Sequence, residues 1–119
     1  MRNPTTGVKR LVNATVNSAN GIRRAFSSEQ AVRQEIYLAV VAIPLAFFLT
    51  ADTVERVLLV VSVILVLLVE LLNTAVEYTV DRIGPEYHEL SGIAKDIGSA
   101  AVLISLCLAA FVWIMIILF

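Results

Sequence analysis

The sequence predicts an all-α integral membrane protein, with an N-terminal amphipathic helix on the membrane surface and three transmembrane helices. One reason is composition: hydrophobic residues make up 59% of the 119-residue chain and the mean hydropathy is +0.87, far above soluble globular domains. The other is distribution, because the apolar residues gather in three runs at 36–51, 57–80 and 97–119. We therefore expect residues 1–119 to form a single membrane domain.

Residues 1–34 form a polar segment that we expect to lie on the cytoplasmic membrane surface. Apolar residues recur at helical spacing over Val8–Ala19, with basic and amide side chains on the opposite face. This pattern is typical of an amphipathic helix in the membrane interface. We expect Asn20-Gly21 to end this helix and Ser27 with Gln30 to form a capping box that begins the next one.

The first apolar run, 36–51, is short for a membrane span and contains Pro44. As a helix it covers about 24 Å. Arg33 and Glu35, which come just before it, must therefore lie near the interface or be shielded by other helices. A mildly acidic turn at 52–56 separates this run from the second one.

The second run, 57–80, carries acidic residues at its inner end. At about 100° per residue, five polar side chains share one helical face. They are Glu70, Asn73, Thr74, Glu77 and Asp81, and the same stripe continues toward the other end of the span as Leu59, Val63 and Val66. A charged side chain at bilayer depth costs roughly 2.5–3.5 kcal/mol, so this stripe needs partners, protonation or water and indicates a functional site. The alternative is a structural role, in which Glu70 and Glu77 only fix the register of neighbouring helices.

The third run, 97–119, follows a polar loop that we expect at 82–95. Small residues near the start of this run would let another helix approach closely. They are Gly98, Ser99, Ala100 and Ala101. Three short spans offer little internal surface to shield a polar stripe, so we expect a homo-oligomer.

The basic residues predict the orientation of the chain. Six of the nine Lys and Arg precede the first span, one lies in the turn 52–56, two lie in the loop 82–95 and none follows the third span. The positive-inside rule then places the N-terminus and the 82–95 loop in the cytoplasm and the C-terminus on the other side.

The sequence contains no P-loop, no Gly-rich kinase loop and no Cys/His cluster with zinc spacing. Nucleotide chemistry would therefore use carboxylate-bound magnesium and a few basic groups. Lys95-Asp96, just before an expected helix start, suits a phosphate, although a snorkelling lysine and a capping aspartate explain the pair equally well. Glu29 has a similar alternative as a first-turn acid paired with Arg33. His88 is typical of a solvated loop residue, and Trp113 of a packing or interface residue.

Three segments read together closely resemble the prokaryotic diacylglycerol kinase family: ELLNTAVEYTVDRIG at 70–84, EYHELSG at 86–92 and AKDIGSAA at 94–101. The resemblance extends to the N-terminal TTG with Arg10, to Arg33-Gln34-Glu35 and to Glu55-Arg56-Val57-Leu58-Leu59, and so covers nearly the whole chain. It implies a homotrimeric enzyme of the bacterial inner membrane. Such an enzyme transfers the γ-phosphate of ATP to diacylglycerol, giving phosphatidic acid.

The resemblance also implies roles for individual residues. Glu70 resembles the general base, supported by Asn73, while Glu29 and Glu77 resemble the Mg²⁺ ligands. The residues implied around ATP are Arg10, Asn17, Glu29, Glu77, Glu86, Tyr87, His88, Lys95 and Asp96. Those implied at the lipid substrate are Arg10, Arg33, Glu35, Arg56, Glu70 and Ser99. A site shared between subunits, as in this family, would join Glu29 to Glu77. The chain departs from the family at Ile93, often a basic residue, and at Asn17, often Tyr.

Two other functions compete with this interpretation. The nearer one is a kinase of the same fold acting on a polyprenol such as undecaprenol, because substrate choice depends on the shape of a lipid-facing groove. The other is a non-enzymatic membrane subunit in which the acids form a proton relay. A relay needs acids across the whole bilayer, whereas the outer half of every span lacks them, so the enzyme is favoured.

Overall fold

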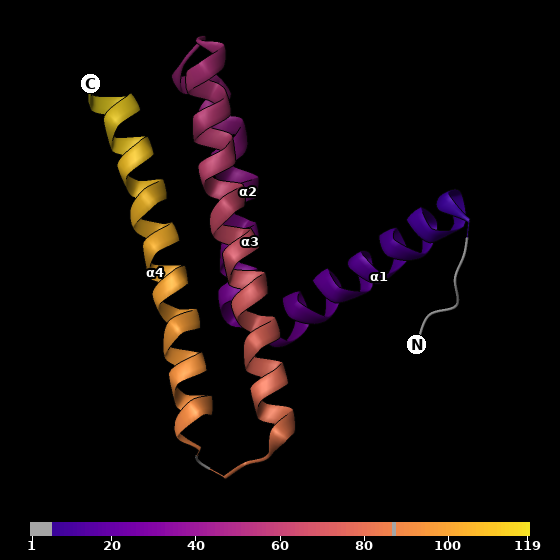
Figure 1. Ribbon diagram of the computed structural model, residues 1–119. Helices are drawn as coiled ribbons and strands as arrows, with labels where there is room; N and C mark the ends of the chain where they lie inside the picture. Colours follow the sequence, from indigo (N-terminus) through magenta and orange to yellow (C-terminus); the bar gives the residue numbers. More distant parts are fainter. Residues whose placement is uncertain (1–5, 87) are drawn as a thin grey trace.

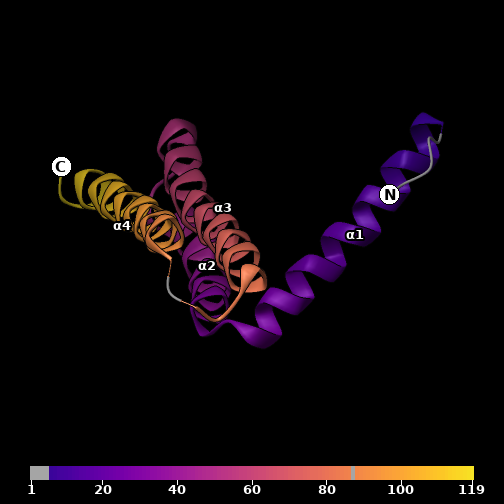
Figure 2. The ribbon, with the colours of Figure 1, turned by 60° about the horizontal axis from the view of Figure 1, so that its bottom comes forward.

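The computed structural model describes residues 6–86 and 88–119, and these residues form four α-helices. The helices are α1 (Gly7–Ser28), α2 (Gln30–Leu49), α3 (Thr53–Ile83) and α4 (Glu89–Leu118). Helices α2, α3 and α4 form a bundle, and α1 projects away from it to one side (Figures 1 and 2). The three bundle helices are each long and apolar enough to cross a membrane. The predicted fold class is confirmed.

Helix α3 is the centre of the bundle, because it packs against both α2 and α4. Its buried face includes the predicted stripe, with Leu59, Val63, Val66, Glu70 and Thr74 all buried. On α2 the buried residues that face this stripe are mostly alanines (Ala39, Ala42 and Ala46), and their small side chains let the two helices approach closely.

Trp113 of α4 joins this core as a packing residue. It lies against the cluster of Ala39, Ala42 and Val63, and its Nε1–H donates a hydrogen bond to Ser62 Oγ at 3.0 Å. An indole buried in an apolar region needs such a partner for its N–H. The contact confirms the packing role that its position in the third span indicates.

The N-terminal helix is longer than predicted, because Asn20-Gly21 does not end it. A glycine inside a helix costs only about 1 kcal/mol, which the contacts of the following turns with the bundle can offset. The expected capping box is also wrong. Ser27 Oγ donates to Arg23 O (2.9 Å) inside α1, and the break between α1 and α2 falls at Glu29, whose backbone is extended.

A compact corner joins α2 to α3 at the end of the bundle remote from α1 (Figure 1). Asp52 is the N-cap of α3 and accepts a hydrogen bond from the Glu55 N–H (2.9 Å). Arg56 Nε–H and an Nη2–H donate to Thr50 O (2.8 Å) and Phe47 O (3.0 Å), so Arg56 satisfies the last carbonyls of α2. Because α3 begins at Thr53, the turn is shorter than the predicted 52–56.

The connection between α3 and α4 is also shorter than the predicted loop 82–95. Helix α3 continues to Ile83, and α4 begins at Glu89 with His88 as its N-cap, where His88 Nδ1 accepts from the Leu90 N–H (3.1 Å). His88 is thus a cap rather than only a solvated loop residue. Lys95 and Asp96 lie in the second turn of α4, not before a helix start as expected. Hydropathy shows where the apolar part of α4 begins, at about residue 97, whereas the helix itself begins earlier, at its N-cap His88.

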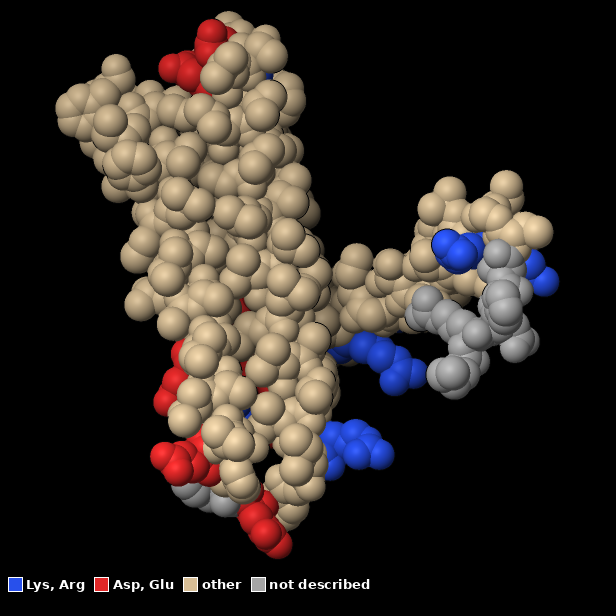
Figure 3. Space-filling model, viewed as in Figure 1, with Lys and Arg blue, Asp and Glu red and all other residues tan. Residues whose placement is uncertain are grey.

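Most apolar side chains of the single chain face outward. Ser105 is the one buried residue of helix α4. Of the most apolar 18-residue stretch of this helix, just 6% is buried within the single chain. Figure 3 shows charged side chains on α1, at the lower ends of α3 and α4 and at the upper corner, with a broad surface between them that is almost free of charge. This surface fits the hydrocarbon of a bilayer or other membrane helices.

Candidate active site

The polar stripe of α3 places a buried carboxyl group between the bundle helices. Glu70 is only 7% exposed, and its Oε2 has no hydrogen-bond partner among the described residues. Glu35 Oε2 on α2 and Asn73 Oδ1 on α3 are also buried and without a partner there. Buried polar atoms are normally hydrogen-bonded. Three unsatisfied oxygens in one region are therefore ready to accept bonds from a bound molecule.

Helix α4 approaches this region closely at Gly98. A Cβ added at Gly98 would overlap with Oδ1 and lie very close to Cγ of the Asn73 side chain. The absence of a side chain therefore gives Asn73 its space between α3 and α4. The prediction of a close helix approach at the small residues is confirmed at Gly98, whereas the neighbouring Ser99 is exposed.

Further carboxylates surround Glu70. The charges of Glu35, Glu77 and Glu29 all act on its carboxyl group within the single chain. Glu29 comes from the break between α1 and α2, so the chain folds a distant residue back onto α3.

The carboxylates define which metal the region suits. Among residues 6–86 and 88–119, no group of three or more acidic, His or Cys side chains is arranged to hold an ion by itself. Mg²⁺ usually takes one or two carboxylates and completes its shell with phosphate oxygens and water. A pair of these carboxylates, such as Glu29 and Glu77, fits Mg²⁺ that arrives with a nucleotide.

A basic group stands beside these acids. Lys95 Nζ pairs with Asp81 Oδ1 at 2.7 Å, and this pair joins α3 to α4 near the connection between them. The charge of Glu77 also acts on Lys95. Lys95 is partly exposed, so it is available to an anionic ligand from the aqueous side.

Other predicted site residues lie apart from the carboxylates. Arg10 and Asn17 are exposed on α1, which projects from the bundle (Figure 2). Glu86 and His88 lie in or at the end of the short connection to α4, and Tyr87 is outside the described residues. Asp96 is exposed on α4.

Arg33 and Arg56, two of the predicted lipid-binding residues, donate hydrogen bonds to backbone carbonyl groups. Arg56 is in the α2–α3 corner, at the end of α3 opposite to Glu77. Arg33 Nη1 donates to Phe26 O (2.9 Å) and Ser27 O (3.1 Å). The guanidinium of Arg33 therefore satisfies the last carbonyls of α1 instead of forming the suggested pair with Glu29.

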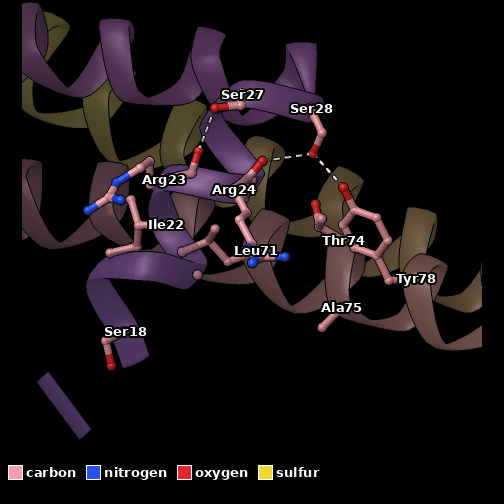
Figure 4. A pocket seen from close by; sticks show the side chains of 12 residues that line it. Ser18, Ile22, Arg23, Arg24, Ser27, Ser28, Leu71, Thr74, Ala75 and Tyr78 are labelled. Atoms are coloured by element: carbon pink, nitrogen blue, oxygen red, sulfur yellow. Dashed lines mark hydrogen bonds between the residues drawn. The ribbon is translucent and has the colours of Figure 1, made fainter. Parts of the chain in front are cut away.

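Two hollows adjoin the site. The larger, of about 890 Å³, lies between the second half of α1 and α3, and Arg23, Ser28, Thr74 and Tyr78 are among the residues around it (Figure 4). The smaller, of about 250 Å³, is almost wholly apolar, runs between the bundle helices and has Glu35 in its lining. Sequence reasoning missed both, since helical spacing gives no information on how α1 lies against α3 or how α2, α3 and α4 lie against one another.

Comparison with known proteins identifies the family of the chain. Residues 16–117 match the sequence model of the family described as prokaryotic diacylglycerol kinase. The diacylglycerol kinase of Haemophilus influenzae is 53% identical over 109 residues, which cover 92% of each chain. That of Escherichia coli K12 is 51% identical over 113 residues, or 95% of this chain and 93% of the other, and that of Pseudomonas aeruginosa is 48% identical over 113 residues, or 95% and 92%. With matches of this extent, the chain belongs to the prokaryotic diacylglycerol kinase family.

Proposed function

We propose that this chain transfers the γ-phosphate of ATP to the free hydroxyl of diacylglycerol, giving phosphatidic acid at the cytoplasmic face of the bacterial inner membrane. One observation carries the proposal beyond family membership. The unpartnered Glu70 carboxyl follows the apolar part of α3 and precedes its charged end at Glu77 and Asp81. A lipid hydroxyl reaches this level from the bilayer, and a nucleotide reaches it from water.

Glu70 acts as the general base in this proposal. Its free Oε2 accepts the proton of the lipid hydroxyl as the oxygen attacks the γ-phosphorus and the bond to the β–γ bridging oxygen breaks. The side chains of Asn73 and Glu35 flank Glu70, and the Asn73 Nδ2–H can donate to the oxygen of the lipid hydroxyl. The apolar hollow beside Glu35 suits a hydrocarbon chain of the lipid.

Glu29 and Glu77 would hold Mg²⁺ with the ATP phosphates. Bound there, the ion supplies neutralisation of the charge that develops on the transferred phosphoryl group. Lys95 adds a positive charge on the aqueous side, where it exchanges part of its contact with Asp81 for a phosphate oxygen. The residues that would complete the nucleotide site are Arg10, Asn17, Glu86, Tyr87, His88 and Asp96.

A homotrimer with sites shared between subunits completes the proposal. The broad apolar surface of α4 and the outward projection of α1 support it, because both offer unpaired surface to other copies. Sedimentation equilibrium in density-matched detergent would give about three times the 13.0 kDa chain mass. A monomer with full activity would contradict this part alone.

The activity is tested with purified protein in mixed micelles. Diacylglycerol and undecaprenol are offered separately with ATP, each with and without Mg²⁺. Magnesium-dependent formation of phosphatidic acid is the expected result. Preference for undecaprenol would keep the mechanism but change the substrate, and no transfer to either lipid by well-folded protein would reject the kinase and favour the non-enzymatic alternative.

A further inference from the structure

A hydrogen bond between two side chains joins the last residue of α1 to α3. Its partners are Ser28 Oγ and the Tyr78 hydroxyl, which are 50 residues apart in the chain (Figure 4). Ser28 directly precedes Glu29, and Tyr78 directly follows Glu77. The bond thus connects the immediate neighbours of the two carboxylates that we assign to Mg²⁺.

The direction of this hydrogen bond follows from the second bond of Ser28. Ser28 Oγ–H donates to Arg24 O at 2.8 Å, and a hydroxyl has only one proton to donate. The Tyr78 O–H must therefore be the donor and Ser28 Oγ the acceptor. A phenylalanine at position 78 would remove the donor and leave the ring in place.

The other polar and aromatic contacts at the end of α1 involve α2. Arg33 donates to the carbonyls of Phe26 and Ser27, and the rings of Phe26 and Tyr37 pack edge to face with centroids 5.8 Å apart. Among the described residues, Ser28 to Tyr78 is the one hydrogen bond that joins α1 to α3. This hydrogen bond therefore fixes the distance between the end of α1, next to Glu29, and helix α3, which carries Glu77.

Glu29 forms the break between α1 and α2. Its backbone is extended (φ −117°, ψ 114°) between two helices, and no side-chain bond caps α2 at this residue. Helix α1 extends 22 residues away from the bundle, so a small rotation at Glu29 moves it and the Glu29 carboxylate relative to α3.

We infer that Ser28 and Tyr78 are positioning residues, which hold the Glu29 carboxylate close enough to Glu77 for both to bind one Mg²⁺. This inference rests on the proposed function. It assigns the two hydroxyls no contact with substrate, and they act only through the placement of Glu29.

The test compares Tyr78→Phe and Ser28→Ala with the unsubstituted chain in the diacylglycerol assay. Each change should raise the half-saturating Mg²⁺ concentration by about threefold to tenfold, the value of one hydrogen bond, while kcat at saturating Mg²⁺ stays close to normal. The double variant should be no worse than either single one, because both remove the same bond. Ser28→Thr, which retains the hydroxyl, should restore normal Mg²⁺ dependence.

Ser27→Ala is the matched control, since Ser27 Oγ bonds only within α1, to Arg23 O. It should leave the Mg²⁺ dependence unchanged. An equal effect of Ser27→Ala, or additive effects of Tyr78→Phe and Ser28→Ala, would mean that these changes act by weakening α1 in general and would overturn the inference.

Two measurements without turnover separate this inference from the proposed function. Binding of Mn²⁺ with a non-hydrolysable ATP analogue, followed by electron paramagnetic resonance, should weaken by the same factor in Tyr78→Phe. Hydrogen exchange of the amides at residues 28–33 should become faster in the ligand-free variant. Normal Mn²⁺ binding and exchange in Tyr78→Phe would reject the positioning role even if the unsubstituted chain is an active kinase, whereas an unsubstituted chain without Mg²⁺-dependent transfer would reject the proposed function itself.

Discussion

Glu70 combines burial with an unsatisfied oxygen, a combination that proteins rarely keep without a use. Its Oε2 lacks a partner among the described residues, and three other acids lie near enough to repel its charge. A buried acceptor without a hydrogen bond costs about 1–3 kcal/mol. A bound hydroxyl would remove that cost during the reaction.

The general-base role predicts the result of Glu70→Gln. Glutamine keeps the size and hydrogen-bonding ability of the side chain but cannot take a proton, so kcat should fall by about 10²–10⁴-fold while the fold is retained. Steady-state kinetics in diacylglycerol micelles, with circular dichroism for the fold, measures both. Glu89→Gln, a change at an exposed acid in the first turn of α4, should have no effect. Near-normal turnover of Glu70→Gln would remove Glu70 from this role.

The metal role predicts a different result for Glu77→Gln. Losing one carboxylate ligand should raise the half-saturating Mg²⁺ concentration by at least about tenfold, since even the loss of a group that only hydrogen-bonds to a ligand costs about 10–100-fold in metal affinity. Titrating Mg²⁺ at fixed ATP measures this shift. Because glutamine still provides an oxygen ligand, high Mg²⁺ should restore part of the activity. A Mg²⁺ dependence identical to that of the unsubstituted chain would show that Glu77 is not a ligand.

At the scale of helices, local periodicity predicts the buried face of α3 but not the ends of α1 and α4. The stripe from Leu59 to Thr74 is a property of one helix, and 3.6-residue spacing is enough to find it. The continuation of α1 past Asn20-Gly21 and the start of α4 at Glu89 depend on tertiary contacts and on a histidine cap. Helix ends of this kind are therefore beyond sequence patterns alone.

The packing of α4 on α3 leads to a prediction at Gly98. Its added Cβ would meet the Asn73 side chain, so Gly98→Ala should displace Asn73 or push the helices apart, at a cost of about 1–3 kcal/mol in stability. Turnover should fall as well, because Asn73 lies one helical turn from Glu70. Thermal unfolding in detergent and kcat measure the two effects.

Gly21→Ala is the matched control for this change. An added Cβ at Gly21 has no atom within 4 Å, and alanine favours a helix over glycine by roughly 1 kcal/mol. It should keep or slightly raise stability, with normal activity. If Gly98→Ala behaves in the same way, the close approach of α4 does not control the position of Asn73.

At the scale of the whole molecule, the site could be predicted only in part because its residues come from every helix. Helical spacing groups Glu70, Asn73 and Glu77, which share α3. It contains no information that Glu35 and Glu29 of the same chain lie near enough to act on Glu70. The resemblance to a family implied only that a site shared between subunits would join Glu29 to Glu77. The Ser28–Tyr78 bond and the hollow between α1 and α3 had no signal in the sequence at all.

The orientation of the chain determines whether this site can meet ATP, and the basic residues predict that it can. In a Cys107→Ser background, Thr53→Cys and Glu89→Cys place single thiols at exposed positions on opposite ends of the bundle. A membrane-impermeant maleimide added to intact spheroplasts should label position 53 and leave position 89 unlabelled, and detergent should expose both. Labelling of position 89 in intact spheroplasts would put Glu77 and Lys95 in the periplasm, away from cellular ATP. Phosphoryl transfer from cytoplasmic ATP would then be impossible whatever the geometry of the carboxylates, so this experiment tests the mechanism as well as the topology.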